Sequence, residues 1–228
     1  IIDLSDNAAQ PMEWGKNCIV YNGEIYNYVE LQKKLINKDH RFTSTSDTEV
    51  LLHGLAIMGI EFLEYLNGMY AFGFYNRETR KIIISIDDFG IKPIYYYKSN
   101  EYFAFSSELN AILCLPRITF EINDLSIVNY LHYGYIPGPE SAIKNIYKLS
   151  PREYIRFDVD NFEMELVRKP SFRRLIIPNN KIENDKKSLK NTINAVVKSH
   201  LVSDVPVGLF LSGGLDSSII CAVASKLY

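Results

Sequence analysis

Residues 205–218 constrain the fold of this 228-residue chain more than any other stretch. An apolar run at 205–211 breaks into a glycine-rich polar loop at 212–218, and the apolar segment 219–224 that follows suits a helix. This order predicts a strand, a tight loop and the start of a helix. Such a loop presents backbone N–H groups to an anion at the helix N-terminus, and two adjacent glycines let the backbone approach a phosphate closely.

Two commoner loops are excluded by single residues. A Walker loop needs a lysine directly after its final glycine, but Gly213 is followed by Gly214. A nucleophile elbow needs a glycine two positions before its serine, but Phe210 stands two positions before Ser212. The pattern that remains at 212–218, SGGLDSS, resembles the PP-loop of ATP pyrophosphatases, which split ATP into AMP and pyrophosphate while they adenylate a carboxylate or carbonyl oxygen.

The PP-loop resemblance implies ATP and Mg²⁺ as cofactors. N–H and hydroxyl donors suit a pyrophosphate, and the carboxylate of Asp216 suits the Mg²⁺ that neutralises it. An ordinary turn of small residues between a strand and a helix is the alternative. The residues expected to bind ATP are Leu211, Ser212, Gly213, Gly214, Leu215, Asp216, Ser217 and Ser218.

Composition and charge argue against several classes of protein. A net charge of -2 gives no reason to expect nucleic acid or an anionic membrane surface as a partner. No apolar run approaches the roughly 20 residues that a membrane-spanning helix needs. Cys18, Cys114 and Cys221 are odd in number and far apart, which indicates a reduced, cytoplasmic chain without disulfides or a cysteine metal site. Each cysteine lies in an apolar run, so we expect all three to be buried.

The residues before 170 read as a mixture of helices and strands. A strand at 18–21 should end at Asn22-Gly23, a strong turn signal. Capping patterns predict helices that start at Asn27 and Ser46. Further helices are expected at 106–113, 125–133 and 189–201. Further strands are expected at 69–75, 81–86, 94–97, 102–105, 153–157 and 163–167.

Five stretches of this part resemble, in sequence and in order, the class II glutamine amidotransferase domains. They are VYNGEIYN at 20–27, TSDTEV at 45–50, GMYAF at 68–72, DDFGIKPIYY at 87–96 and FSSE at 105–108. Together with the PP-loop, they make the chain similar to the glutamine-hydrolysing asparagine synthetase family over nearly its whole length.

This resemblance implies an α+β fold in two domains. Residues 1–170 would form an amidotransferase domain, an Ntn-hydrolase type α/β/β/α sandwich of antiparallel sheets. Residues 171–187 would be a linker, and residues 188–228 the start of a parallel α/β PP-loop domain that binds ATP.

In that family an N-terminal cysteine attacks the side-chain amide of glutamine, and an oxyanion develops that needs donors. The side chain of Asn22 and the N–H of Gly23 match the oxyanion positions. Glu24 and Asp47 match positions that bind the α-amino end, where carboxylates suit an ammonium group. Without the family, Asn22-Gly23 would be a turn and Asp47 a helix N-cap. The glutamine-binding residues that the resemblance implies are Ile1, Ile2, Asn22, Gly23, Glu24 and Asp47.

Some features depart from the family pattern. The nucleophilic cysteine and the arginine that clamps the glutamine carboxylate would lie upstream of Ile1, so we expect the chain as given not to hydrolyse glutamine. Cys18 lacks a free α-amine and cannot substitute. Ile86 stands where the family has arginine, which puts the local hydrogen bonding in question. The family's second ATP segment and its aspartate pocket would lie beyond Tyr228.

The family resemblance implies ATP-dependent amidation of aspartate through β-aspartyl-AMP, with ammonia taken from glutamine. The carboxylate must be activated because it is a poor acyl donor to ammonia at neutral pH, and two separate sites imply an internal path for ammonia. Two alternatives stay open: amidation of another carboxylate, such as a sugar acid, and a non-catalytic regulatory or binding protein. The formation of a homodimer is also left open.

Overall fold

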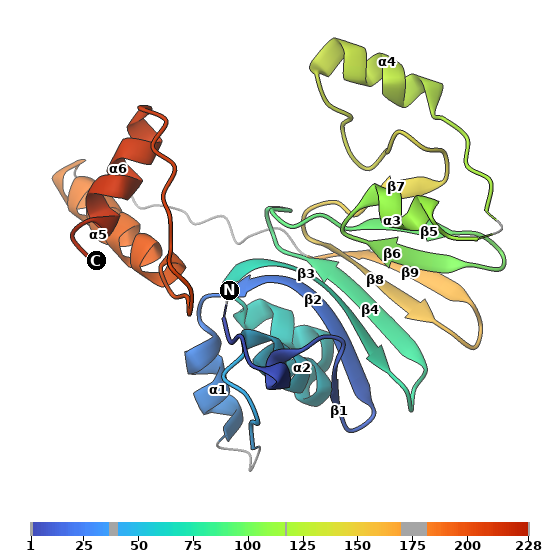
Figure 1. Cartoon of the computed structure of the whole chain (residues 1–228), viewed down its shortest axis with the longest axis horizontal. Coiled ribbons are helices and arrows are strands. Elements are labelled where there is room, and N and C mark those ends of the chain that lie inside the picture. The colour runs from blue at the N-terminus through green and yellow to red at the C-terminus, as the bar shows by residue number, and fades with distance from the viewer. Residues whose placement is uncertain (1, 37–40, 117, 170–181, 228) are drawn as a thin grey trace.

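The computed structural model describes residues 2–36, 41–116, 118–169 and 182–227. Two antiparallel sheets lie face to face in the part before residue 170 (Figure 1). The larger sheet has the order β1 (Met12–Trp14), β2 (Asn17–Ile25), β3 (Gly68–Asn76), β4 (Lys81–Ile86), β8 (Glu153–Asp158) and β9 (Glu163–Arg168). The smaller sheet has the order β6 (Phe103–Ser106), β5 (Tyr95–Lys98) and β7 (Ile146–Lys148).

Helices cover the outer faces of this pair of sheets. On the larger sheet lie α1 (Tyr28–Ile36) and α2 (Asp47–Met58), followed by η2 (Gly59–Tyr65), and α3 (Leu109–Leu113) packs on β5 and β6. The short η1 (Asp6–Ala8) precedes β1, and α4 (Asp124–Tyr133) connects the smaller sheet's strands. The expected α/β/β/α sandwich of antiparallel sheets is therefore confirmed.

Alternation along β3 creates two cores, because successive side chains of a strand point to opposite faces. Tyr70, Phe72 and Phe74 pack with α1 and α2 in the first core. Ala71 faces the second core between the sheets, and a Cβ on Gly73 would lie 2.3 Å from the ring of Phe105. Small residues on this face thus let the second sheet pack close.

The amidotransferase-like part confirms most of the expected elements. The predicted strands correspond to β3, β4, β5, β6, β8 and β9, and helices follow Asn27 and Ser46. Ser46 caps α2 by accepting a hydrogen bond from the N–H of Thr48. Gly134 ends α4 in the left-handed conformation at φ 77°. Local capping and turn chemistry thus set several element ends.

The turn expected at Asn22-Gly23 is wrong. β2 runs through both residues to Ile25 and pairs with β3 along its whole length, with Gly23 opposite Tyr70. A Cβ at Gly23 would lie 2.2 Å from the carbonyl oxygen of Met69. The glycine is therefore needed for close approach of two strands, not for a reversal of the chain.

The strand expected at 205–211 is also wrong: these residues have no strand assignment, and the side chain of Phe210 is 99% exposed. A parallel strand needs neighbours to bond with, and the described residues after 181 contain no other strand. The helix expected after the loop is present as α6 (Leu215–Ala224).

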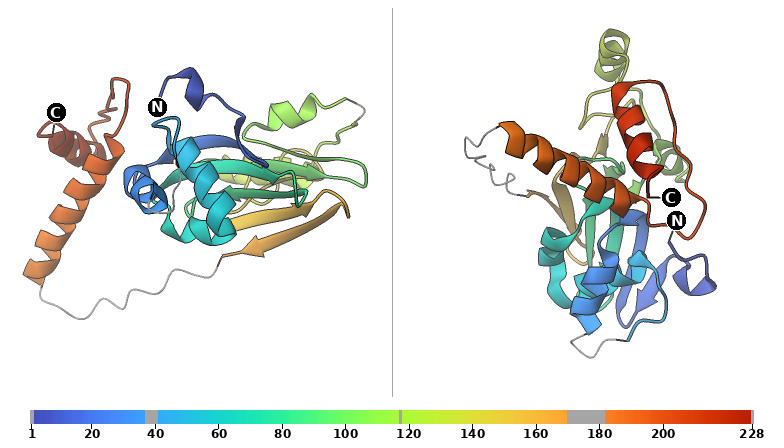
Figure 2. Two further views of the ribbon diagram at one scale, coloured as in Figure 1. Left: turned by 90° about the horizontal axis from the view of Figure 1, so that it is seen from below. Right: turned by 90° about the vertical axis from the view of Figure 1, so that its left-hand side faces the viewer.

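The helix expected at 189–201 is the later part of α5 (Ile182–His200), which packs against α6. α5 begins inside the range expected for the linker, and residues 170–181 of that range lie outside the described residues. Both helices lie on the side of the sandwich where the N-terminal segment and the end of β2 are found (Figure 2).

The sequence led to expectations about membrane-spanning helices and about the three cysteines, and the structure bears on each. Among the helices that the structure describes, none is both long and apolar enough to cross a membrane. Cys18, Cys114 and Cys221 are free thiols. The expectation that all three are buried is wrong: Cys18 and Cys221 are only partly buried, and Cys114, the C-cap residue of the short helix α3, is exposed.

Candidate functional site

A cavity of about 440 Å³ brings together the residues expected to bind glutamine. Its walls come from the N-terminal segment, β2, the first turn of α2, β3 and the loop after β4. All five of the expected residues that the structure describes line it, namely Ile2, Asn22, Gly23, Glu24 and Asp47. Ile1 lies outside the described residues.

Asp47 is the most enclosed polar group of this cavity, with 3% of its surface exposed. Its Oδ2 accepts hydrogen bonds from the hydroxyl of Tyr21 at 2.8 Å and from the N–H of Ile25 at 2.9 Å. Burial raises the pKa of Asp47 above its usual range, and these hydrogen bonds oppose the rise. Because Ser46 is the N-cap of α2, the alternative that made Asp47 the cap is wrong.

Asn22 and Gly23 lie on β2 at the mouth of the cavity. Asn22 is exposed, and its Nδ2 lies 3.4 Å from the hydroxyl oxygen of Ser107, which follows β6. A side-chain amide that faces an open cavity can donate to an oxygen that becomes negative during a reaction.

The charged side chains that line the cavity are mainly acidic. Asp3, Glu24 and Asp47 contribute carboxylates, whereas Lys92 is the lysine of the lining. This excess of negative charge suits the ammonium group of an amino acid.

The sequence patterns did not predict several polar residues of the cavity lining, among them Gln10 and Lys92. The Oε1 of Gln10 accepts a hydrogen bond from the N–H of Tyr21. Gln10 lies in an irregular segment and carried no sequence signal. Lys92 belongs to the stretch 87–96 that indicated the family, but only the folded loop places it at the cavity.

Asp87 organises the loop that carries Lys92. It is 1% exposed, and its carboxylate accepts hydrogen bonds from the N–H groups of Tyr70, Phe89, Ile91 and Lys92. Ile86, at the position where the resemblance leads us to expect arginine, is buried in the core between the sheets. Backbone donors of the loop and of β3 thus satisfy the carboxylate of Asp87 next to this isoleucine.

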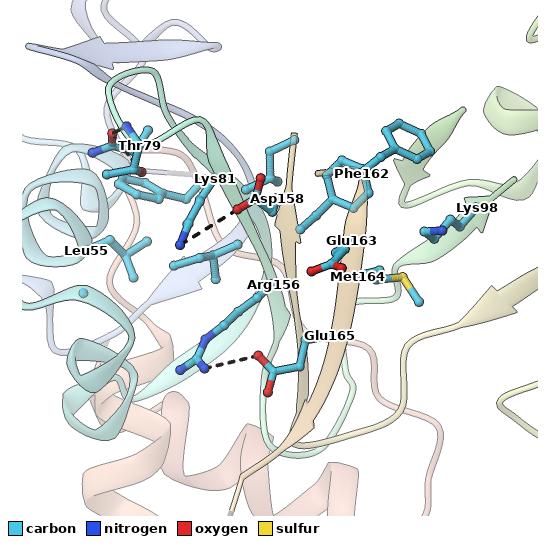
Figure 3. A pocket seen from close by; sticks show the side chains of 16 residues that line it. Leu55, Thr79, Lys81, Lys98, Arg156, Asp158, Phe162, Glu163, Met164 and Glu165 are labelled. Atoms are coloured by element: carbon cyan, nitrogen blue, oxygen red, sulfur yellow. Dashed lines mark hydrogen bonds and ion pairs between the residues drawn. The ribbon is translucent and has the colours of Figure 1, made fainter. Parts of the chain in front are cut away.

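A larger cavity, of about 970 Å³, lies over β4, β8 and β9 and contains none of the expected residues (Figure 3). Four of its charged side chains form pairs: Arg156 contacts Glu165 at 3.4 Å, and Lys81 contacts Asp158 at 4.0 Å. The residues expected to bind glutamine therefore meet in the smaller of these two cavities.

The expected ATP loop is exposed at the N-terminus of α6. Gly213 adopts φ +80°, the hydroxyl oxygens of Ser212 and Ser217 lie 3.0 Å apart, and Asp216 lies in the first helical turn. Hydroxyl and N–H donors at the start of a helix fit a pyrophosphate.

The metal expectation rests on Asp216 alone. Across residues 2–36, 41–116, 118–169 and 182–227, no group of three or more His, Cys, Asp or Glu side chains could hold a metal ion. A single carboxylate fits Mg²⁺ that is held mainly by the phosphates of a nucleotide.

Two contacts join the segment before the ATP loop to the neighbourhood of the first cavity. The N–H of Asp3 donates to Oδ2 of Asp204 at 2.8 Å. The rings of Tyr26 and His200 lie 3.9 Å apart. The end of α5 and the segment after it thus contact Tyr26, next to the cavity, and Asp3, which lines it.

The two-sheet sandwich, with its acidic cavity at β2, has the fold of the Ntn-type glutamine amidotransferase domains. The fold agrees with a solved structure, the glutamine phosphoribosylpyrophosphate amidotransferase of B. subtilis, at a TM-score of 0.51 and 18% identity. That comparison covers 98% of this chain and 48% of the other.

Family comparison then makes the assignment specific. Residues 1–167 match the family model described as glutamine amidotransferase domain, and the chain belongs to this family. Residues 188–228 match a second model, described as asparagine synthase.

The curated relatives are consistent with both matches. Asparagine synthetase [glutamine-hydrolyzing] 1 of Bacillus subtilis is 34% identical over 100% of this chain and 36% of its own length. A protein of Methanocaldococcus jannaschii, provisionally named as a glutamine-hydrolysing asparagine synthetase, is 39% identical over 98% of this chain and 46% of its own length. The chain thus spans less than half the length of these relatives.

Proposed function

We propose that this chain carries the glutamine-binding part of a ligase that amidates aspartate, with ammonia from glutamine and with AMP and pyrophosphate as products. The observation that carries the proposal is the acidic cavity, which joins Asn22, Gly23, Glu24 and Asp47 in one lining. The names of the relatives support aspartate as the acceptor.

In the cavity, the carboxylates of Glu24 and Asp47 would bind the α-ammonium group of glutamine. The amide of Asn22 and the N–H of Gly23 would then stabilise the oxyanion that forms at the side-chain carbonyl. A donor placed for the transition state typically contributes about 10²–10³-fold in rate. The described lining holds no cysteine, so these residues receive binding and oxyanion roles and no covalent step.

At the loop of α6, the hydroxyls of Ser212, Ser217 and Ser218 and the N–H groups of Gly213 and Gly214 would hold the phosphates. Asp216 would bind the accompanying Mg²⁺. ATP supplies the adenylation that turns the acceptor carboxylate into an acyl donor. The two sites are separate, so we propose an internal path for ammonia. We also place the protein in the cytoplasm, since its cysteines are free.

The division of labour is tested with the full-length protein and two substitutions. Asn22→Ala should lower glutamine hydrolysis by about 10²-fold and leave synthesis from free ammonia intact. Asp216→Ala should abolish ATP-dependent synthesis and leave glutamine hydrolysis intact. Loss of both activities in either variant would contradict two separate sites.

The acceptor is tested by the release of pyrophosphate from ATP. We expect release that depends on aspartate. Release with another carboxylic acid, and none with aspartate, would replace aspartate as the proposed acceptor.

A further inference from the structure

Tyr21 occupies a special place in the glutamine cavity because it lines the wall and bonds to a buried carboxylate at the same time. Its hydroxyl donates to Oδ2 of Asp47 at 2.8 Å. The backbone N–H of Tyr21 is itself held by the side chain of Gln10. Tyr21 is thus anchored at both ends.

We propose that Tyr21 is the positioning residue for Asp47: its hydroxyl fixes the orientation of the carboxylate toward the ammonium group of the substrate. This inference rests on the proposed function of the cavity. It assigns to Tyr21 a role in affinity for a free α-amino acid, and no contact with the reacting carboxamide.

The geometry supports a positioning role for the hydroxyl. Two donors, from Tyr21 and from the N–H of Ile25, converge on one oxygen of Asp47 from the same strand. A side-chain substitution cannot remove the backbone N–H of Ile25, but Tyr21→Phe removes the hydroxyl of Tyr21. The carboxylate lies in the first turn of α2, where negative charge is also favoured by the helix dipole.

The electrostatics give the hydroxyl a second effect. Burial raises the pKa of Asp47, and the hydrogen bonds from Ile25 and Tyr21 lower it. The other titratable groups that line the cavity are Asp3, Glu24 and Lys92, and the charge of Glu24 also raises the pKa of Asp47. Loss of the hydroxyl would therefore raise this pKa further, and less of the carboxylate would be ionised at mildly acidic pH.

The test compares Tyr21→Phe with wild type in the full-length protein. Steady-state hydrolysis of glutamine is measured across the pH range, and binding of glutamine is measured separately by calorimetry. We expect KM to rise about tenfold, as for a lost hydrogen bond to a charged group, with kcat within about twofold. The acidic limb of kcat/KM should move to higher pH.

Two further variants separate positioning from a general effect on packing. Tyr75→Phe makes the same change on β3, away from the cavity, and should leave KM and the acidic limb unchanged. In an Asp47→Asn background, Tyr21→Phe should add little to the loss of binding, because the carboxylate that it orients is gone.

The outcomes distinguish this inference from the function on which it rests. If wild type binds and hydrolyses glutamine and Tyr21→Phe keeps the wild-type KM and pH profile, the positioning role is overturned. An equal loss with Tyr75→Phe would overturn it too. If wild type neither binds nor hydrolyses glutamine, the proposed function fails and the inference fails with it.

Discussion

The pairing of β2 with β3 predicts a large effect of adding one methyl group at Gly23. In Gly23→Ala, the new Cβ would lie 2.2 Å from the carbonyl oxygen of Met69 and 2.7 Å from the Cα of Tyr70. Both atoms belong to the backbone of the neighbouring strand, so no side-chain rotation can relieve the contact.

The magnitude follows from the distance that the strands must move. Ordinary contact begins at 3.4 Å, so β2 and β3 must separate locally by about 1.2 Å. A backbone hydrogen bond of about 2.9 Å would stretch to about 4.1 Å, beyond its range. Loss of about two such bonds, at about 1 kcal/mol each, plus about 1–3 kcal/mol of strain from overpacking gives roughly 3–5 kcal/mol of destabilisation.

Urea unfolding of the full-length protein measures this cost. Trp14, the single tryptophan of the sequence, packs against the core between the helices and the larger sheet and reports on it by fluorescence. The matched control is Gly15→Ala in the turn after β1, where φ is +58° and no atom lies within 4 Å of the new Cβ. That change should cost about 1 kcal/mol, through backbone strain alone. If Gly23→Ala costs no more than the control, the close-approach argument is refuted.

Three smaller effects should follow from local features. Ser46→Ala removes the cap of α2 and should lower the free energy of unfolding by about 1 kcal/mol in urea titrations; an unchanged midpoint would contradict the cap. Gly134→Ala, at φ 77° and with no atom near the new Cβ, should cost a similar amount because alanine resists the left-handed conformation. Hydrogen bonds from the Ser5 side chain and from the N–H groups of Ser5 and Thr45 lower the pKa of Asp3 from 3.8 to about 2. The ionised carboxylate of Asp3 therefore stabilises the fold fully above pH 3.8, and this stabilisation is lost as the pH falls through 2. Asp3→Asn should therefore flatten the pH dependence of stability in that window, and an unchanged slope would count against the assigned hydrogen bonds.

Local patterns predicted much of the sandwich. Apolar and aromatic runs separated by short polar turns identified β3, β4, β8 and β9, because β3 with β4 and β8 with β9 each form a hairpin of neighbouring strands. Ser46 marked the start of α2 in the sequence because serine caps helices, and in the structure its side chain accepts a hydrogen bond from the first turn of α2.

Contacts between distant segments, or the lack of them, explain the two elements that the sequence patterns predicted wrongly. Asn22-Gly23 is a turn signal locally, yet the pairing with β3 overrides it. The run at 205–211 reads as a strand, but the described residues give it no strand to pair with.

The candidate site divides in the same way. The family motifs alone are enough to group Asn22, Glu24 and Asp47 in one site, because each of these residues lies in a stretch that resembles the family. The contribution of Gln10, Lys92 and the hydroxyl of Tyr21 depends on how loops and strands converge in space, and no spacing along the chain encodes it.

The central claim is that glutamine binds in the cavity at β2 and not in the larger cavity over β4, β8 and β9. Calorimetric titration of the full-length protein with glutamine tests it through two matched substitutions of an acid by its amide, Asp47→Asn and Glu165→Gln. We expect Asp47→Asn to weaken binding by at least about tenfold, as loss of a charged partner would, and Glu165→Gln to leave binding unchanged. Weaker binding with Glu165→Gln and wild-type binding with Asp47→Asn would contradict it.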